Sequence, residues 1–287
     1  MLRAAPAAGP LDRLPPQVLF VLGAISQYVG SAFAVLLFAS VPAAGVAWLR
    51  IVAAAAVFVA WRRPWRTRWT RGRLQLVAAF GMALALMNLM FYLAIDRLPL
   101  GTAVAIEFCG PIAVAALGSR TRRDLAALAL AVGGVLALAD VHIAGSPVGF
   151  ALAAGAGVFW AAYIVLGHRV AADPQIRPQD GLALAMAIGA AGLAPALVVS
   201  AVPALVSPPL LVACLAVGVA ASVVPYGLEQ IAMRRLARAR FALLLALMPA
   251  TAAIIGAIVL GQVPGLVEAG GIALIVVAAS LRTHADV

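Results

Sequence analysis

Ten apolar runs, separated by short breaks, constrain the fold of this chain more than any other feature. Each run has about the 17–25 residues that a helix needs to cross a bilayer. Proline and glycine stand in several of the breaks, as in Pro99-Leu100-Gly101 and Ser207-Pro208-Pro209. We therefore expect an all-α integral membrane protein of about ten transmembrane helices, at residues 17–38, 43–60, 74–95, 102–118, 124–140, 147–167, 181–201, 209–230, 241–260 and 266–282.

The composition supports a membrane protein and argues against a soluble one. The chain has 287 residues, of which 65% are hydrophobic and 10% charged, and its mean hydropathy is +1.10. Soluble domains average about 25% charged residues, so this chain has too few to cover itself for water. Residues 1–16 are short and proline-rich, and we expect a cytoplasmic N-terminal segment there rather than a cleavable signal peptide.

The net charge of +10 does not predict a nucleic-acid partner, because the arginines are segregated by topology. With the N-terminus inside, the outer loops hold only Arg97, and Arg50 lies within a run. Loops on the cytoplasmic side of a membrane carry an excess of basic residues. The pattern therefore predicts that both termini are cytoplasmic, with inner segments that hold Arg3, Arg13, Arg62, Arg63, Arg66, Arg68, Arg71, Arg73, Arg120, Arg122, Arg123, Arg169, Arg177, Arg234, Arg235, Arg238, Arg240 and Arg282.

The chain also repeats itself. AIDRLPLG and then GP around the fourth run correspond to AMRRLARA and then MP around the ninth, so that Pro111 matches Pro249. VGGVLAL and AGGIALI near the ends of the halves match Gly134 to Gly271. We therefore expect two halves of five runs each, at residues 17–140 and 147–282. Because five is odd, the second half is expected to be inverted, with a substrate site between the halves near the midplane.

The run 102–118 contains a carboxylate, Glu107, at membrane depth. A charged side chain there costs about 2.5–3.5 kcal/mol on insertion scales. Pro111, preceded by Gly110, has no N–H, so the carbonyl of Glu107 loses its helical partner. At membrane depth, a backbone group without its helical partner is tolerated only where it is buried in protein or lines a cavity. Pro225 and Pro249 predict further helix breaks, but the repeat places Leu245 opposite Glu107, so the acid belongs to one half only.

Few other polar side chains interrupt the runs, and we expect them to line a substrate-binding or coupling cavity with Glu107. Those three or four positions apart share a helix face. The set comprises Gln27, Tyr28, Arg50, Asn88, Tyr92, Trp160, Tyr163, Tyr226 and Glu229.

Several of these residues have an equally ordinary structural explanation. Gln27 and Asn88 are of the type that forms hydrogen bonds between helices, and Trp160 and Tyr163 could simply pack. Glu229 stands about one turn before Arg234 and Arg235, where an interfacial ion pair would form. Arg50 could be the counter-ion of Glu107 or of Glu229.

No catalytic, cofactor or metal motif is present. The sequence contains no HExxH, GxSxG, Walker or CxxC pattern, and its three histidines do not cluster. Cys109 and Cys214 lie inside apolar runs, where we expect buried small hydrophobic residues. We therefore expect neither an enzyme nor a cofactor. A multiply charged anion is a poor cargo because only Arg50 lies within a run. The sequence does not specify an oligomeric state.

Three segments resemble a known family: GMALALMNLMFYLAIDRLPLGTAVAIEFCGPIAVAALGSR, FWAAYIVLGHRVA and VVPYGLEQIAMRRL. They are similar to the EamA-type carriers of the drug/metabolite transporter superfamily, and within it to the bacterial threonine/homoserine exporter branch. The resemblance implies an exporter of small amino acids or related metabolites in the bacterial inner membrane, exchanging them for protons. One departure is Gly261-Gln262, where this superfamily often has Gly-Glu.

The sequence adds a chemical hypothesis to this resemblance. Glu107 would bind either a proton or the ammonium group of the substrate, and Arg50 would balance that charge or meet the substrate carboxylate. Two other interpretations stay open. One is a multidrug or aromatic-metabolite exporter, in which aromatic side chains stack on the cargo, and the other is a membrane scaffold that transports nothing.

Overall fold

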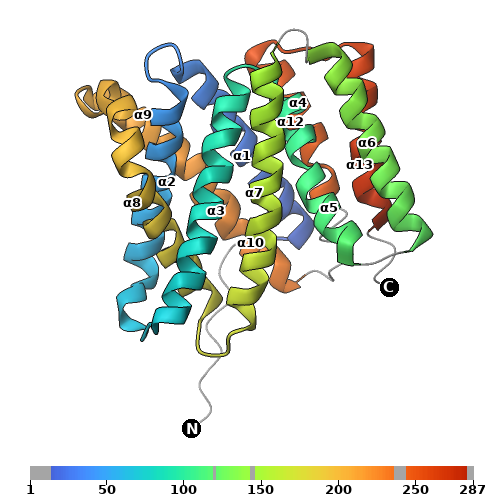
Figure 1. Cartoon of the computed structure of the whole chain (residues 1–287). Helices are drawn as coiled ribbons and strands as arrows, with labels where there is room; N and C mark the ends of the chain where they lie inside the picture. The colour runs from blue at the N-terminus through green and yellow to red at the C-terminus, as the bar shows by residue number, and fades with distance from the viewer. Residues whose placement is uncertain (1–13, 119–120, 143–145, 236–243, 283–287) are drawn as a thin grey trace.

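The computed structural model describes residues 14–118, 121–142, 146–235 and 244–282, and within them it is helical without strands (Figure 1). The first half contains α1 (Pro16–Leu37), α2 (Ala43–Arg62), the short 3₁₀ helix η2 (Pro64–Arg66), α3 (Arg71–Ile95), α4 (Leu100–Glu107), α5 (Cys109–Gly118) and α6 (Arg122–His142). The second contains α7 (Pro147–Ala172), α8 (Pro178–Leu205), α9 (Pro208–Gly218), the π-helical turn η3 (Val219–Val223), α10 (Val224–Arg235), α12 (Met248–Leu260) and α13 (Leu266–Arg282). Residues 1–13 of the N-terminal segment, and with them Arg3 and Arg13, lie outside the described residues, as do Arg120, Arg238 and Arg240.

The helices begin where local chemistry favours a start. Pro16, Pro147, Pro178 and Pro208 occupy the first turn of their helices, where the missing N–H would have no partner in any case. Ser146 accepts a hydrogen bond from the backbone N–H of Gly149 and caps α7. These signals explain why the helices fall close to the expected runs.

Six described segments are long and apolar enough to cross a membrane: α1, α2, α3, α7, α8 and the continuous stretch Pro208–Glu229. Shorter apolar helices cover Leu100–Val114, Leu125–Leu138, Leu244–Leu260 and Leu266–Leu281. The protein is therefore an all-α, multi-pass membrane protein, with about ten helical segments of transmembrane character.

Three of the segments are interrupted close to a proline. The helix stops between α4 and α5 at Phe108, three residues before Pro111. A turn at Leu247 precedes α12, in which Pro249 lies in the first turn. The π-helical turn η3 ends two residues before Pro225. The interruptions thus lie up to one turn N-terminal to each proline, which is the side on which the ring removes a hydrogen bond.

Helices of the two halves pack against each other along the whole bundle. α2 contacts α8, α4 contacts α12 and α6 contacts α13, while α3 pairs with α7 and α1 with α10. Gly134 and Gly271 meet across α6 and α13, since a β-carbon on Gly134 would lie 2.7 Å from the carbonyl oxygen of Gly271 and the reverse distance is 3.0 Å. This pairing of equivalent positions agrees with a two-fold relation between the halves, although the division at residues 140 and 147 remains a prediction.

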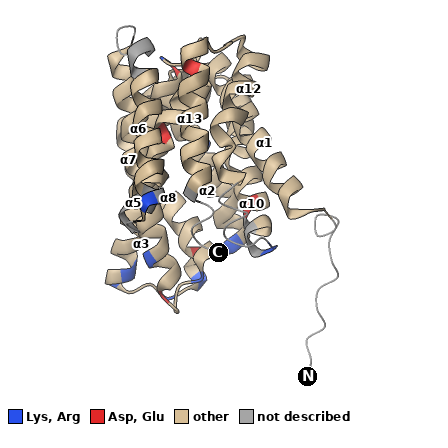
Figure 2. Cartoon of the chain, turned by 90° about the vertical axis from the view of Figure 1, so that its right-hand side faces the viewer, with Lys and Arg blue, Asp and Glu red and all other residues tan. Residues whose placement is uncertain are grey.

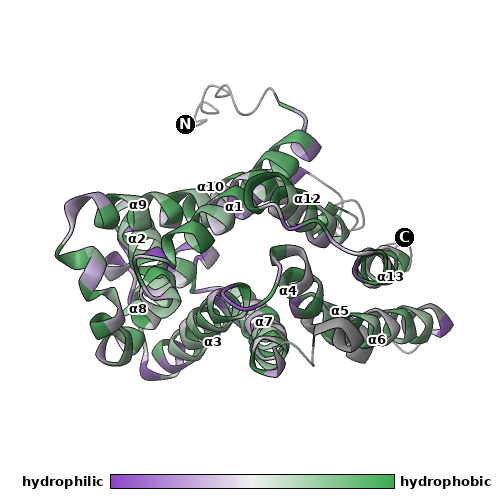
Figure 3. Ribbon diagram, turned by 90° about the horizontal axis from the view of Figure 1, so that it is seen from above, coloured by the Kyte–Doolittle hydropathy of each residue, from purple (hydrophilic) through white to green (hydrophobic). Residues whose placement is uncertain are grey.

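Apolar and charged residues are distributed as a bilayer requires. Viewed along the helices, most residues of the helical ribbons are hydrophobic (Figure 3). Most of the described arginines lie at one end of the bundle, where α2 connects to α3 and α7 connects to α8 (Figure 2). We call this the arginine-rich end. The opposite end carries Arg97 and the contact between α4 and α12.

Candidate functional site

Glu107 is the last residue of α4 and its side chain is buried. The backbone at this interruption packs against α7, because a β-carbon on Gly157 would lie 2.9 Å from the carbonyl oxygen of Glu107. A β-carbon on Gly110 would collide with the carbonyl of Gly157. The freed carbonyl expected from Pro111 is therefore covered by α7. Two glycines permit the close approach.

Arg50 lies buried in α2 and binds the irregular turn η3. Its Nε donates to Ser222 Oγ at 2.8 Å, and its Nη2 donates to the carbonyl oxygen of Ala221 at 2.9 Å. The guanidinium carbon also lies 5.0 Å from the centre of the Tyr92 ring, within the range of a cation–π contact. Arg50 therefore joins α2, α3 and η3 at one point.

The sequence around Pro225 explains why these acceptors are available. In an α-helix the carbonyl of Ala221 would bind the N–H of residue 225, which proline lacks. The π-helical bond from Val224 N–H to Val219 O also leaves the carbonyl of Ala220 without its α-helical donor. Ser26 Oγ donates to that oxygen at 2.8 Å. Side chains of α1 and α2 thus satisfy two carbonyls that Pro225 releases inside the membrane-spanning region.

The carboxylates of the predicted site lie within electrostatic range of these groups. Arg50 interacts with Glu107, and both Glu107 and Glu229 act on Tyr28 and on Tyr226. The five residues come from α1, α2, α4 and α10. The structure therefore brings the buried residues Arg50, Glu107 and Tyr28 together with the half-buried Tyr226 and Glu229 between the halves, and we call this set the buried polar region.

This region contains no close ion pair among the described side chains. The ion pairs among the described residues lie elsewhere, and they are Arg62–Asp180, Arg73–Asp173 and Arg97–Asp96. Arg50 is instead held by η3, so it acts on Glu107 without contacting it. Arg235 donates to the carbonyl of Leu14 at 3.0 Å rather than to Glu229, and the side chain of Arg234 lies outside the described residues.

Two aromatic pairs flank this polar region on α7. The Trp160 ring meets Phe108 edge-on, with ring centres 5.1 Å apart, at the interruption after Glu107. Tyr163 stacks on Phe80 of α3 at 4.9 Å and interacts electrostatically with Tyr226 and Glu229. Both residues are half-buried. Trp160 and Tyr163 therefore pack against neighbouring rings and also lie near the carboxyl groups of Glu107 and Glu229.

The remaining predicted residues have weaker ties to the polar region. Asn88 is buried, and its Nδ2 donates to the carbonyl of Leu84 in its own helix rather than to a neighbouring one. Gln27 is half-buried on α1. Tyr92 Oη and Ser31 Oγ are buried, and Arg50 and Ser31 both act on the Tyr92 hydroxyl.

Sequence reasoning missed five participants: Ser26, Ser31, Phe80, Phe108 and Ser222. The serines are small hydroxyl residues inside apolar runs, which is a signal, but such residues are common in transmembrane helices. The two phenylalanines look like ordinary core residues until the fold places them against Trp160 and Tyr163.

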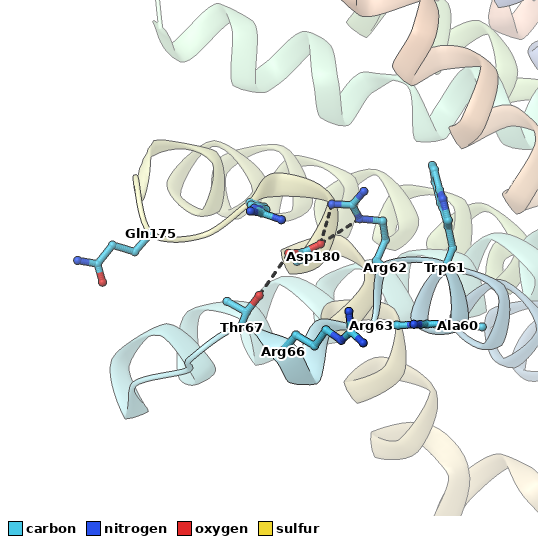
Figure 4. Close-up of a pocket in the computed structure, with 9 residues that line it drawn as sticks. Ala60, Trp61, Arg62, Arg63, Arg66, Thr67, Gln175 and Asp180 are labelled. Carbon is cyan, nitrogen blue, oxygen red and sulfur yellow. Dashed lines mark hydrogen bonds and ion pairs between the residues drawn. The ribbon is translucent and has the colours of Figure 1, made fainter. Parts of the chain in front are cut away.

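Two pockets lie away from Glu107. One, of about 780 Å³, opens at the arginine-rich end and is lined by Trp61, Arg63, Arg66 and Arg177 among others (Figure 4). The other, of about 370 Å³, is an apolar groove between α2 and α8, where Trp48 Nε1 donates to the carbonyl of Ala190 at 2.8 Å. The central substrate cavity therefore remains a prediction.

At the opposite end, Gln262 joins the halves. Its Oε1 accepts a hydrogen bond from the first N–H of α4, that of Leu100, at 2.9 Å. Gly261 has φ +66° and directs the chain there, a conformation that glycine adopts without strain. Gln262 is thus an uncharged cap at the start of α4.

The fold and the buried polar region define a class, that of a multi-pass helical membrane protein with ionisable groups held between its halves. Comparison with known proteins gives the family. The model of the EamA-like transporter family matches residues 147–283. Curated relatives named threonine/homoserine exporter RhtA are 37% identical over 260 residues in Salmonella typhimurium and 36% identical in Escherichia coli K12, covering 88% of this chain and 87% of theirs. The chain belongs to the EamA-like transporter family.

A solved crystal structure supports the fold independently. It covers 94% of this chain and 98% of its own, with a TM-score of 0.59 and 19% sequence identity. At that identity the likeness concerns the arrangement of helices alone.

Proposed function

We propose that this protein exports threonine, homoserine or a similar small amino acid across the bacterial inner membrane, in exchange for protons. The observation that carries this proposal is the 36–37% identity, over 88% of the chain, to exporters named for those two amino acids. Both termini would be cytoplasmic, in agreement with the arginines gathered at one end of the bundle.

The buried polar region suits a zwitterionic substrate. An amino acid carries a carboxylate and an ammonium group, and this region offers one guanidinium and two carboxyl groups. The hydrogen bonds of Arg50 to η3 use Nε and Nη2, and we propose that its Nη1 meets the substrate carboxylate. Glu107, within electrostatic range of Arg50, would receive the substrate ammonium. Gln27, Asn88, Tyr92, Trp160 and Tyr163 would line the walls.

Competition at Glu107 would couple the two fluxes. When the carboxyl group is protonated it no longer attracts an ammonium group, so proton and substrate exclude each other. Movement of the two inverted halves would then expose the site to each side in turn. A proton entering from outside would release the substrate there, and its release inside would prepare the site for the next substrate.

Exchange of Glu107 for glutamine tests this mechanism in proteoliposomes. We expect Glu107→Gln to abolish threonine efflux driven by a pH gradient. The amide of glutamine does not take up and release a proton as a carboxyl group does, and it has no negative charge to attract an ammonium ion. Glu107→Asp should restore part of the activity. Asp96→Asn, which removes an exposed carboxylate from the Arg97–Asp96 ion pair of the first half, is the control. Gradient-driven efflux at the wild-type rate in Glu107→Gln would exclude the coupling role.

A second candidate function is export of aromatic metabolites or lipophilic cations. The pairs Trp160–Phe108 and Tyr163–Phe80 favour it, because half-buried rings beside a carboxylate could stack on an aromatic cargo. Counterflow of threonine and homoserine compared with tryptophan and a lipophilic cation distinguishes the two. A scaffold that transports nothing predicts no counterflow of any of them.

A further inference from the structure

The pocket at the arginine-rich end is separate from the buried polar region and has a different chemistry. Four arginines and one aspartate lie among its lining residues, which are Ala60, Trp61, Arg62, Arg63, Arg66, Thr67, Gln175, Arg177 and Asp180. Its volume of about 780 Å³ would accommodate a group much larger than a water molecule. It is open to the outside, between the end of α2 and the start of α8 (Figure 4).

The one carboxylate of this pocket is already neutralised. Asp180 is buried, and its Oδ1 lies 2.9 Å from Nη2 of Arg62. Its Oδ2 accepts a hydrogen bond from Thr67 Oγ1 at 3.2 Å. Arg63, Arg66 and Arg177 are exposed, and no ion pair among the described residues includes them. Three positive charges therefore face the pocket without an acidic partner in the described part of the chain.

The loop that carries Arg63 and Arg66 has a defined conformation. Arg63 is the only described non-glycine residue with positive φ, at +52°, and its N–H still bonds the carbonyl of Val59 at 2.8 Å. The chain then turns through η2, with Pro64 buried. Trp69 Nε1 donates to the carbonyl of Pro64 at 3.0 Å. Arg63 and Arg66 are thus presented from a fixed turn rather than from a loose loop.

The surrounding aromatic residues place this pocket at the depth of lipid headgroups. Trp61 is 63% exposed and Trp65 is 64% exposed, at the end of an apolar helix. Exposed tryptophan at such a position is typical of the interface between hydrocarbon and water. A guanidinium binds the oxygens of a phosphate through paired hydrogen bonds. Basic pockets between transmembrane helices bind anionic headgroups in this way.

We infer that this pocket binds the phosphate group of an anionic phospholipid from the leaflet at the arginine-rich end. Arg63, Arg66 and Arg177 supply the hydrogen bonds, and Trp61 contacts the region next to the headgroup. Since the pocket is formed by residues 60–67 of the first half and 175–180 of the second, a bound lipid bridges the halves. A lipid that binds only the folded protein stabilises it, and this stabilisation grows with the logarithm of the affinity.

Purified protein in a neutral detergent tests the proposal by thermal unfolding and by native mass spectrometry. The probes are phosphatidylglycerol, phosphatidylcholine and inorganic phosphate. We expect phosphatidylglycerol to raise the unfolding temperature and to remain bound in the mass spectrum, and phosphatidylcholine to do neither. An equal effect of inorganic phosphate, with no retained lipid, would assign the site to a soluble anion and contradict the lipid.

The triple variant Arg63→Gln, Arg66→Gln, Arg177→Gln removes the three free charges. Its control is Arg68→Gln, Arg71→Gln, because Arg68 lies on the same loop and Arg71 begins α3, but neither lines the pocket. We expect the affinity for phosphatidylglycerol to fall by tenfold or more, a change of about 1.4 kcal/mol, in the triple variant only. An equal loss in the control would show a general attraction to basic residues and overturn the site. If the triple variant does not fold, Arg66→Gln and Arg177→Gln are measured singly with the same expectation in direction.

Discussion

At the scale of single residues, the position of Arg50 follows from a residue far away in the sequence. Pro225 withholds an N–H from the carbonyl of Ala221, and the guanidinium of Arg50 supplies the missing donor. A buried arginine would ordinarily need a carboxylate, but here backbone and hydroxyl oxygens of η3 accept its hydrogen bonds. Its charge remains available to act on Glu107.

Replacing Arg50 by leucine should therefore destabilise the fold as well as stop transport. The change leaves the carbonyl of Ala221 buried without a donor, at an expected cost of about 1–3 kcal/mol. Thermal unfolding in detergent measures it. Arg97→Leu is the control, because Arg97 is exposed and its partners among the described residues are its neighbour Asp96 and the carbonyl of Leu93. Equal unfolding temperatures for Arg50→Leu and the wild type would contradict the proposed role of the hydrogen bonds.

The sequence could identify the unusual residues of the candidate site but not their partners. Glu107 and Arg50 stand out because charge is rare in an apolar run. Ser26 and Ser222 do not, since their importance depends on carbonyls that become free only when Pro225 produces a π-helical turn. A proline in a sequence predicts an interruption, whereas which carbonyl it frees depends on the hydrogen-bond register of the turn before it.

At the scale of helices, the interruptions occur where two backbones are in close contact. α5 approaches α7 closely at Gly110 and Gly157, shortly after Glu107. The proline removes a hydrogen bond, and the glycines let the neighbouring helix cover the exposed backbone. The proline and glycine of the GP motif thus have different physical roles.

Gly110→Ala tests the packing role of the first glycine. The added β-carbon would collide with the carbonyl of Gly157, and overpacking of this kind costs about 1–3 kcal/mol. Gly133→Ala is the matched control, because a β-carbon added at Gly133 would have no neighbour within 4 Å among the described residues. Alanine should stabilise that helix by about 0.5–1 kcal/mol. Unfolding temperatures that shift in the same direction for both variants would contradict the argument.

Pro225→Ala tests whether an interruption that destabilises the helix is nevertheless needed for transport. The new N–H can bond the carbonyl of Ala221, so α9 and α10 can join in one regular helix. We expect an unfolding temperature equal to or above that of the wild type, because proline destabilises a helix interior. Transport in proteoliposomes should fall, since Arg50 then loses an acceptor that fixes its position. Wild-type transport in this variant would show that the π-helical turn is dispensable.

At the scale of the whole molecule, much of the fold could be predicted from the sequence because the bilayer allows few alternatives. A run of about 20 apolar residues must be a helix, and the observed bounds differ from the expected ones by only a few residues. The pairing of α3 with α7 and of α1 with α10 could not be read from the runs, since lipid-facing and helix-facing residues are equally apolar. Small residues at the contacts are only a weak signal of which helices pair. Gly81 and Gly189, which bring α3 and α8 together, are an example.

The two halves are also tied by ion pairs at the arginine-rich end. Arg62 binds Asp180, and Arg73 Nε lies 2.8 Å from Asp173 Oδ2. The hydrogen bond from Arg73, together with one from the backbone N–H of Gln175, holds the pKa of Asp173 below its ordinary value of 3.8. Because folding favours the charged form, the contribution of this pair to stability is complete above the unfolded pKa. It is lost only as the pH falls through the lowered folded pKa.

Because the pKa of Asp173 is lowered, the pH dependence of stability can be distinguished from the pH dependence of transport. Between pH values of about 5 and 8 Asp173 stays ionised, so the difference in unfolding temperature between wild type and Asp173→Asn should be constant there and disappear only in stronger acid. Transport, if Glu107 exchanges a proton, should change across the same interval in both proteins. A wild-type advantage in stability that is already lost at about pH 6 would mean that Asp173 takes up its proton in the physiological range. The pH dependence of transport could then reflect loosening of the halves rather than protonation of Glu107.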